Sequence, residues 1–228
     1  MFSLYLVKYN FEHFDTYNQT NKFSKNCLSL NIWVPQNKNG PVFVVIHGGS
    51  YSGGTASLDN HNGSILTIKS RATVVNINYR LGVFGFLYLG NNSKIKGNIG
   101  FLEQQMDMKW VYENIKKFGS KKDKITLFGE SAEGASVTGH FLPVASYKYF
   151  SRVVVMLANN KQCLNNSLYK NSIRKYKKKL AKFLKCRGNS EKILKCLHAT
   201  NVKKLLKASV NMRNNKVAYY KRFIYPSR

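Results

Sequence analysis

Short apolar runs, separated by glycine-rich and polar stretches, follow one another along the first two thirds of the chain. Clustered β-branched and aromatic residues predict strands over residues 28–34, 41–46, 73–79, 125–128 and 153–157. The runs 41–46 and 153–157 are apolar throughout, as in strands buried on both faces. Helical spacing covers residues 98–118 up to Gly119, and a small-residue helix is expected after residue 131. Alternating strands and helices predict an α/β domain with a mostly parallel sheet.

Beyond residue 160 the pattern changes. The segment 173–184 (IRKYKKKLAKFL) places its apolar residues on one helical face, with lysines opposite: Ile173, Tyr176, Leu180, Phe183 and Leu184. Such a helix could lie on a membrane or bind an acidic partner, but a surface helix with a solvated face is the default. We therefore divide the chain into an unassigned segment, 1–26, an α/β core, 27–160, and a basic, helix-rich continuation of the same domain, 161–228.

Charge is unevenly distributed along the 228 residues, whose net charge is +27. Residues 1–150 hold 16 basic and 9 acidic residues, whereas residues 151–228 hold 21 basic residues and only Glu191 as an acid. So basic a segment can attract phosphates or anionic lipids. However, Lys outnumbers Arg 29 to 8, and Asn, Ile, Tyr and Phe are abundant. This bias fits drift towards A/T-rich codons better than selection for bidentate phosphate binding. Weak polyanion binding by residues 161–228 is accordingly the last-ranked functional hypothesis.

Several classes of protein are not indicated by the sequence. No apolar run approaches the ~20 residues of a membrane span, so no transmembrane segment is expected. The stretch Phe2 to Val7 has no basic segment before it and no cleavage site after it, and makes a poor signal peptide. The five histidines are scattered, and no Cys–His spacing suits zinc. We expect no metal, no cofactor and no specific nucleic-acid partner.

Two glycine-rich turns carry the strongest chemical signal. Ser131 follows the strand 125–128 in the motif GESAEG. Serine is a poor nucleophile until a base removes its proton, and a sharp strand–turn–helix holds its hydroxyl where a base can reach it. The loop 47–54 (HGGSYSGG) directly follows the strand 41–46. Its backbone N–H groups, with that of Ala132, could stabilise the oxyanion of a tetrahedral intermediate.

These turns belong to a longer series of motifs that resembles the type-B carboxylesterases. The series comprises CLSLNIWVP from Cys27, PVFVVIHGGSYSGGT from Pro41, NYRLGVFGFL from Asn78, GNIGFLEQQ from Gly97, WVYENIKKFG from Trp110 and ITLFGESAEGASV from Ile125. The resemblance implies an α/β-hydrolase fold, incomplete at both ends of this chain. It also implies hydrolysis of small-molecule carboxylic esters and a secreted or extracellular protein.

The resemblance also implies roles for individual residues. Ser131 matches the family's nucleophile, and Glu130 matches the acid that precedes it near the site. The family's oxyanion-hole donors correspond to Gly49, Ser50 and Ala132. His47 opens the glycine loop and is expected to support that loop rather than to act as the catalytic base.

Three departures from the family pattern fall on the catalytic machinery. Glu133 replaces a glycine, where a long side chain is expected to strain the turn and a buried carboxylate would be costly. Ser50 replaces the third glycine of the loop and loses that residue's conformational freedom. After the nucleophile, the acids Glu133 and Glu191 and the histidines His140 and His198 do not lie in the context of the family's triad. His140 is expected to be a packed helix residue, and the chain alone is expected to be inactive.

The cysteines add to the resemblance. Cys186 and Cys196, in CRGNSEKILKC, resemble a short disulfide loop of secreted family members, so we expect a disulfide between them. Cys27 matches a cysteine that normally pairs upstream, and Cys163 has no assigned partner. The alternative is a reducing compartment with four free thiols.

Three functional hypotheses follow. The first is the N-terminal half of a serine carboxylic ester hydrolase, which as a fragment is expected to aggregate. The second is a non-catalytic carboxylesterase-like protein with an adhesion or binding role, or a decayed gene product. Glu133 and Ser50 favour this second hypothesis, and the intact Ser131 counts against it. The third is a polyanion- or membrane-binding role for residues 161–228.

Overall fold

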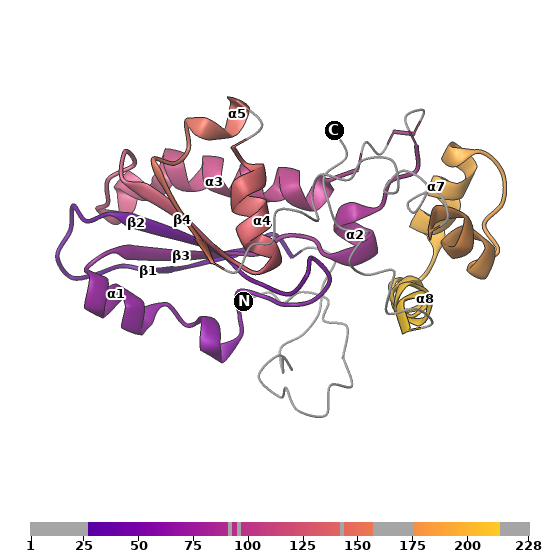
Figure 1. The fold of residues 1–228 in the computed structure, drawn as a ribbon, viewed down its shortest axis with the longest axis horizontal. Coiled ribbons are helices and arrows are strands. Elements are labelled where there is room, and N and C mark those ends of the chain that lie inside the picture. Colours follow the sequence, from indigo (N-terminus) through magenta and orange to yellow (C-terminus); the bar gives the residue numbers. More distant parts are fainter. Residues whose placement is uncertain (1–26, 91–92, 95–96, 142–143, 157–175, 215–228) are drawn as a thin grey trace. The chain divides into compact units, whose positions relative to one another are not determined.

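The apolar runs of the sequence form one five-stranded sheet (Figure 1). The computed structural model describes residues 27–90, 93–94, 97–141, 144–156 and 176–214. The strands lie in the order β1-β3-β2-β4-β5, and their bounds are β1 (Leu30–Trp33), β2 (Val42–Ile46), β3 (Thr73–Ile77), β4 (Ile125–Glu130) and β5 (Arg152–Met156). β1 runs antiparallel to β3, and the other neighbours are parallel. The predicted α/β class with a mostly parallel sheet is confirmed.

Burial differs between the middle and the end of this sheet. Every residue of β3 is buried, as expected for a strand with neighbours and helices around it. The run 153–157 was predicted to be equally buried, but within it Val155 is 41% and Met156 44% exposed. That part of the prediction is wrong: β5 is the last strand of the sheet among the described residues, so its faces are less covered.

Helices cover both faces of the sheet. α1 (Ser64–Ser70) connects β2 to β3, and the connection from β3 to β4 returns in the opposite direction across the sheet through α3 (Ile99–Asn114) and η3 (Ile115–Phe118). Because such connections are right-handed, α1 lies on one face, and α3 and α4 (Ala132–Gly139) lie on the other (Figure 1). Two short elements lie in the connections: η2 (Asp59–His61) precedes α1, and α5 (Val144–Tyr147) follows α4. The predicted helix 98–118 is therefore α3 followed by η3.

The chain divides into two compact units. Unit 1 comprises Met1–Arg80 and Gly100–Asn159 and contains the sheet; unit 2 comprises Leu81–Ile99 and Asn160–Arg228. The described helices of unit 2 are α2 (Gly82–Phe86), residues 176–183, α7 (Ser190–Ala199) and α8 (Val202–Asn214). The division expected from the sequence, at residues 26 and 160, stays a prediction.

Unit 2 has a small apolar core of its own, with Leu89, Leu180 and Ala208 almost fully buried. Lys177 Nζ and Ser190 Oγ both donate to the carbonyl oxygen of Leu89, which ties two helices to the segment before residue 90. The predicted disulfide Cys186–Cys196 is present. In the part of the chain that the structure describes, no helix is long and apolar enough to cross a bilayer.

The predicted helix 173–184 is present over its described residues, 176–183, and Ile173 lies outside them. Leu180 and Leu184 are buried as predicted, but Phe183 is 53% exposed. Successive residues are about 100° apart around a helix, so Phe183 falls outside the narrow stripe that Leu180 and Leu184 share. The prediction that Phe183 belongs to the buried face is wrong.

Candidate active site

Ser131 is the single residue between the end of β4 and the start of α4. Its backbone angles are φ 61° and ψ −121°, a conformation that residues other than glycine rarely adopt. Its backbone N–H donates to the carbonyl oxygen of Met156 at 2.9 Å, which ties the turn to the end of β5. Such strain persists only where the surrounding structure imposes it, and it is common at functional sites. The predicted strand–turn–helix is present at the predicted residue.

The glycine loop, residues 47–54, leaves the sheet at the same edge as this turn. β2 and β4 are parallel neighbours in which Ile46 pairs with Gly129, so their carboxyl ends lie side by side. Within the loop, the N–H groups of Ser52 and Gly53 both donate to the carbonyl oxygen of Gly49, each at 3.1 Å. A Cβ atom on Gly49 would lie 2.1 Å from the Gly53 oxygen, so this tight turn accepts only glycine.

Two residues of the glycine loop are not glycine although their backbone favours it. Ser50 has φ 54° and Tyr51 has φ 55°, so two consecutive side-chain-bearing residues occupy the left-handed region. The left-handed conformation costs such residues roughly 1–2 kcal/mol each. The loss of freedom expected from Ser50 in place of glycine therefore falls on a position whose backbone does favour glycine.

The ring of His47 packs against the backbone of the glycine loop. The ring is 3% exposed, its Nδ1 donates to the Gly48 carbonyl at 3.0 Å, and it stacks on Tyr79 with 5.0 Å between centroids. The backbone of Gly54 packs so closely that a Cβ there would lie 2.6 Å from Nδ1. Burial lowers the pKa of His47 to about 4, so the ring is neutral at neutral pH. This geometry agrees with the supporting role expected from the sequence.

The remaining predicted site residues flank the turn. Glu130 ends β4, pairs in register with Met156 and is half-buried. Ala132 and Glu133 are the first two residues of α4. Because the backbone at residue 133 is helical, glycine is not required there for its conformational freedom. The catalytic and oxyanion-hole roles of these residues stay predictions.

A buried chain of polar side chains connects the glycine loop to α4 and α3. Ser136 Oγ donates to Tyr51 Oη at 3.0 Å, and Gln104 Nε2 donates to Ser136 Oγ at 3.3 Å. His140 Nε2 donates to Gln104 Oε1 at 3.1 Å, and its ring stacks on Phe101 at 3.9 Å. Burial lowers the pKa of His140 to about 3. His140 is thus a packed residue, as expected.

Sequence reasoning did not find this network. Tyr51 and Ser136 both lie within the motifs quoted above, but they are 85 residues apart, and no spacing rule links them. Only the stacking of α4 and the glycine loop over neighbouring strands brings them together.

A second polar cluster joins the segment after β3 to α3: Glu103 and Asp107 are buried in it, whereas the Arg80 side chain is partly exposed. Arg80 Nε lies 2.6 Å from Glu103 Oε1, and the Arg80 backbone N–H donates to Glu103 Oε2 at 2.8 Å. Burial, with a smaller contribution from the charge of Glu103, raises the pKa of Asp107 to about 8. Cys27, a free thiol among the described residues, has its pKa raised to about 11 by burial. No three side chains of the described His, Cys, Asp and Glu residues are placed to bind a metal ion.

Comparisons with known proteins agree with this geometry. Residues 9–225 match the carboxylesterase family. The chain is 44% identical over 143 residues to acetylcholinesterase 1 of Caenorhabditis elegans, covering 61% of this chain and 23% of that protein. It is 36% identical over 209 residues to the cholinesterase of Mus musculus, covering 86% and 33%. For the acetylcholinesterase of Bungarus fasciatus the identity is 40% over 147 residues, covering 64% and 24%. The chain thus spans about a quarter to a third of these relatives.

Proposed function

Because the chain belongs to the carboxylesterase family, we propose that it is part of a serine hydrolase of small-molecule carboxylic esters, with Ser131 as nucleophile. Its sheet and crossover helices are those of an α/β-hydrolase. The observation that carries the proposal is the strained backbone of Ser131, φ 61°, at the end of the strand beside the glycine loop. Relatives named cholinesterase and acetylcholinesterase support an ester as the substrate.

In the proposed reaction, Ser131 Oγ bonds to the ester carbonyl carbon while a histidine outside the described residues takes its proton. The carbonyl electron pair moves onto oxygen, where the N–H groups of the oxyanion hole stabilise it: Gly49, Ser50 and Ala132. The bond to the alkoxy oxygen then breaks, and the alcohol leaves with the proton from that histidine. Water, deprotonated by the same base, releases the acid and regenerates Ser131. Glu130 lies one residue before the nucleophile.

None of the four described histidines is proposed as the base. His47 and His140 are buried, and each makes hydrogen bonds that fix its ring. His61 Nδ1 donates to the Thr55 carbonyl oxygen at 2.7 Å, and His198 belongs to α7 in unit 2. We therefore propose that these 228 residues alone hydrolyse esters poorly, and that assays need the full-length protein.

The test is covalent labelling of the folded full-length protein with a fluorophosphonate. We expect one adduct, on Ser131, and its loss in Ser131→Ala, whereas the matched variant Ser64→Ala should label like the wild type. Unlabelled, folded wild-type protein would overturn the proposed nucleophile.

The competing function, a non-catalytic relative, is favoured by Ser50 in left-handed backbone and by Glu133 in place of a glycine. The variant Glu133→Gly in the full-length protein separates the two. A large gain in ester hydrolysis would mean that the catalytic site is intact apart from Glu133. No hydrolysis in either form would favour an adhesion or binding role.

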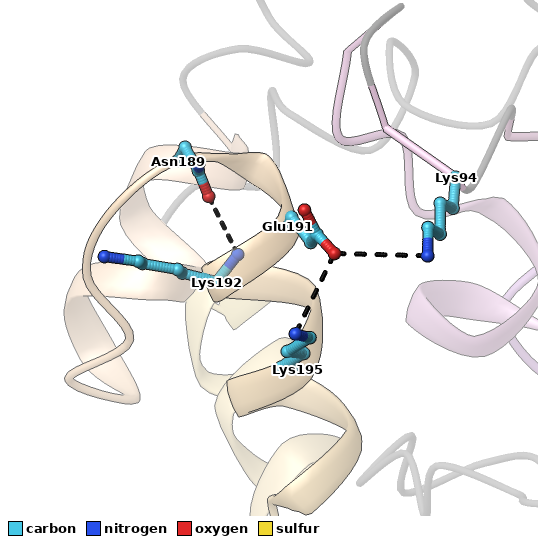
Figure 2. Close-up of polar contacts among 5 residues, drawn as sticks. All are labelled: Lys94, Asn189, Glu191, Lys192 and Lys195. Atoms are coloured by element: carbon cyan, nitrogen blue, oxygen red, sulfur yellow. Dashed lines mark hydrogen bonds and ion pairs between the residues drawn. The ribbon is translucent and has the colours of Figure 1, made fainter.

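We also propose that unit 2 binds polyanions weakly. Figure 2 shows the Glu191 carboxylate between Lys195 and Lys94. Its Oε1 lies 3.8 Å from Lys195 Nζ and 4.0 Å from Lys94 Nζ, and Asn189 caps α7 by accepting from the Lys192 N–H at 2.9 Å. Glu191 is the only acid among the described residues of unit 2, whose exposed cations include Lys178, Lys182, Lys185 and Lys192. Retention on heparin should fall steeply with salt. Binding that ignores ionic strength would contradict this proposal.

Secretion of the intact protein is proposed on the disulfide Cys186–Cys196, because disulfides persist in oxidising compartments. Recovery of the full-length protein from the culture medium of secreting cells, with this bond oxidised, is the expected result. Retention inside the cell with both thiols free would contradict it.

A further inference from the structure

The glycine loop contains a strained pair of residues and one side-chain tie from α4. Ser50 and Tyr51 both have φ near +55°, and neither has the freedom of glycine. Strained backbone of this kind relaxes unless the surroundings hold it. The side chain of Tyr51 leaves the loop and ends, 3% exposed, at the hydroxyl of Ser136 on the helix that Ser131 begins.

The tie belongs to a directed series of hydrogen bonds. Gln105 Nε2 donates to Ser146 Oγ at 2.7 Å, and Ser146 Oγ lies 3.3 Å from His140 Nδ1. Because Gln104 Oε1 can only accept, His140 Nε2 must donate to it, so Nδ1 accepts from Ser146. Gln104 Nε2 then donates to Ser136, whose hydroxyl proton goes to Tyr51 Oη.

This series is rigid because its inner members are excluded from water. Ser136 is 1% exposed, and Gln104, His140 and Ser146 are each 0% exposed. Hydrogen bonds in a low-dielectric interior are stronger than in water, and donors arranged in one direction polarise one another. The hydroxyl of Ser136 is therefore fixed in position and in direction, and so is the partner that it holds.

We infer that Tyr51 and Ser136 are positioning residues: their hydrogen bond holds the glycine loop in the left-handed conformation that aims the Ser50 N–H, a restraint made necessary by Ser50 in place of glycine. This inference rests on the proposed function, in which that N–H stabilises the oxyanion. Neither side chain touches substrate in the proposed reaction, and both act through the backbone of the loop.

The test compares fluorophosphonate labelling of full-length wild type, Tyr51→Phe and Ser136→Ala. Each variant removes one hydroxyl. The rate constant for covalent bond formation between Ser131 and the probe should fall roughly tenfold, which is less than the effect of losing an oxyanion-hole donor. The affinity of reversible probe binding should stay within about twofold of wild type. Adding Ser50→Gly to Tyr51→Phe should restore most of the rate, since glycine adopts φ 54° without strain. Tyr112→Phe, which removes the hydroxyl of a half-buried tyrosine of α3 outside this series, is the matched control and should behave like wild type.

Hydrogen exchange of the same proteins gives a readout independent of chemistry. In Tyr51→Phe, the amides of Ser52 and Gly53 should exchange roughly tenfold faster, while those of β1 stay unchanged. Unchanged exchange in the loop, or a labelling rate within twofold of wild type, would overturn the inference. If the wild type does not label but the loop loosens in Tyr51→Phe, the proposed function fails and the restraint on the loop stands.

Discussion

Units 1 and 2 treat ionisable side chains in opposite ways. Unit 1 buries them: His47, Glu103, Asp107 and His140 are each less than 10% exposed, and burial moves the pKa of all four towards the neutral form. Unit 2 keeps most of its described lysines at the surface, around a small apolar core and one disulfide, although Lys177 is half-buried and donates to the Leu89 carbonyl oxygen.

The difference follows from the size of the two cores. A five-stranded sheet covered by helices offers enough packed surroundings to hold polar side chains in fixed hydrogen bonds away from water. Short helices around a small core can enclose fewer such groups: in unit 2 burial shifts the pKa of Tyr176 and of Lys177, while most charged side chains stay in water, where a charge costs little free energy. We therefore expect pH to act mainly on unit 1 and salt mainly on unit 2.

The largest effects should come from cavities, which test whether the two cores are separate. Leu127 in β4 and Leu180 in unit 2 are both 0% exposed, and truncating either to alanine should cost about 2–5 kcal/mol. Peptide-resolved hydrogen exchange should show Leu127→Ala loosening the sheet and Leu180→Ala loosening α7 and α8. The control Leu102→Ala, at a position 56% exposed, should change little. Equal loosening of both units by either core variant would show that the two cores are not separate.

Loss of the disulfide should rank next and should act on unit 2. Cys186 and Cys196 are separated by 10 residues, and opening a loop of that size removes about 2–3 kcal/mol in the chain-entropy account. Denaturant unfolding of Cys186→Ser with Cys196→Ser should show this loss in unit 2 and no change in the sheet. Reductant added to the double variant should have no further effect; a further loss would assign the effect to another thiol.

Asp107 should make unit 1 sensitive to pH. Its folded pKa, about 8, lies above the ordinary value of 3.8, so the folded state binds more protons than the unfolded state between about pH 4 and pH 8. The contribution of Asp107 to stability should therefore fall as pH rises through this window. Below about pH 6.5 the buried His47 and His140, whose pKa values are lowered, act with the opposite sign, so the effect of Asp107 is read as the difference between wild type and Asp107→Asn. Asp107→Asn should remove this contribution and raise stability at pH 8 by on the order of 2 kcal/mol, measured by urea unfolding at a series of pH values. The exposed control Asp123→Asn should follow the pH dependence of the wild type. A difference between wild type and Asp107→Asn that does not change with pH would refute the assignment.

The smallest effect should come from the single acid of unit 2. The side chains of Glu191, Lys94 and Lys195 are 52%, 83% and 79% exposed, so both ion pairs are strongly screened. Glu191→Gln should cost no more than about 0.5 kcal/mol at low salt, and the difference should vanish at high salt. A cost that persists at high salt would show that Glu191 acts through packing instead of charge.

The sequence predicted the elements that depend on neighbouring residues. The strands around residues 42–46 and 125–130, the helix after Ser131 and the sharp turn between strand and helix all follow from local patterns and quoted motifs. The two errors of burial, at Val155 and Phe183, concern what covers a residue from elsewhere in the chain. A short apolar run looks the same in the middle of a sheet and at its end.

For the candidate site, the sequence by itself determined which residues are proposed to carry the chemistry: the serine of the turn and the glycine loop, with Ser50 in place of a glycine. Tertiary structure alone decided that Ser50 and Tyr51 take up left-handed backbone, that Asp107 is buried beside Glu103, and that Tyr51 meets Ser136. Side-chain chemistry and local periodicity are properties of the sequence itself. Burial, pKa shifts and hydrogen bonds across 85 residues exist only after strands and helices have packed, because they depend on which distant atoms replace water.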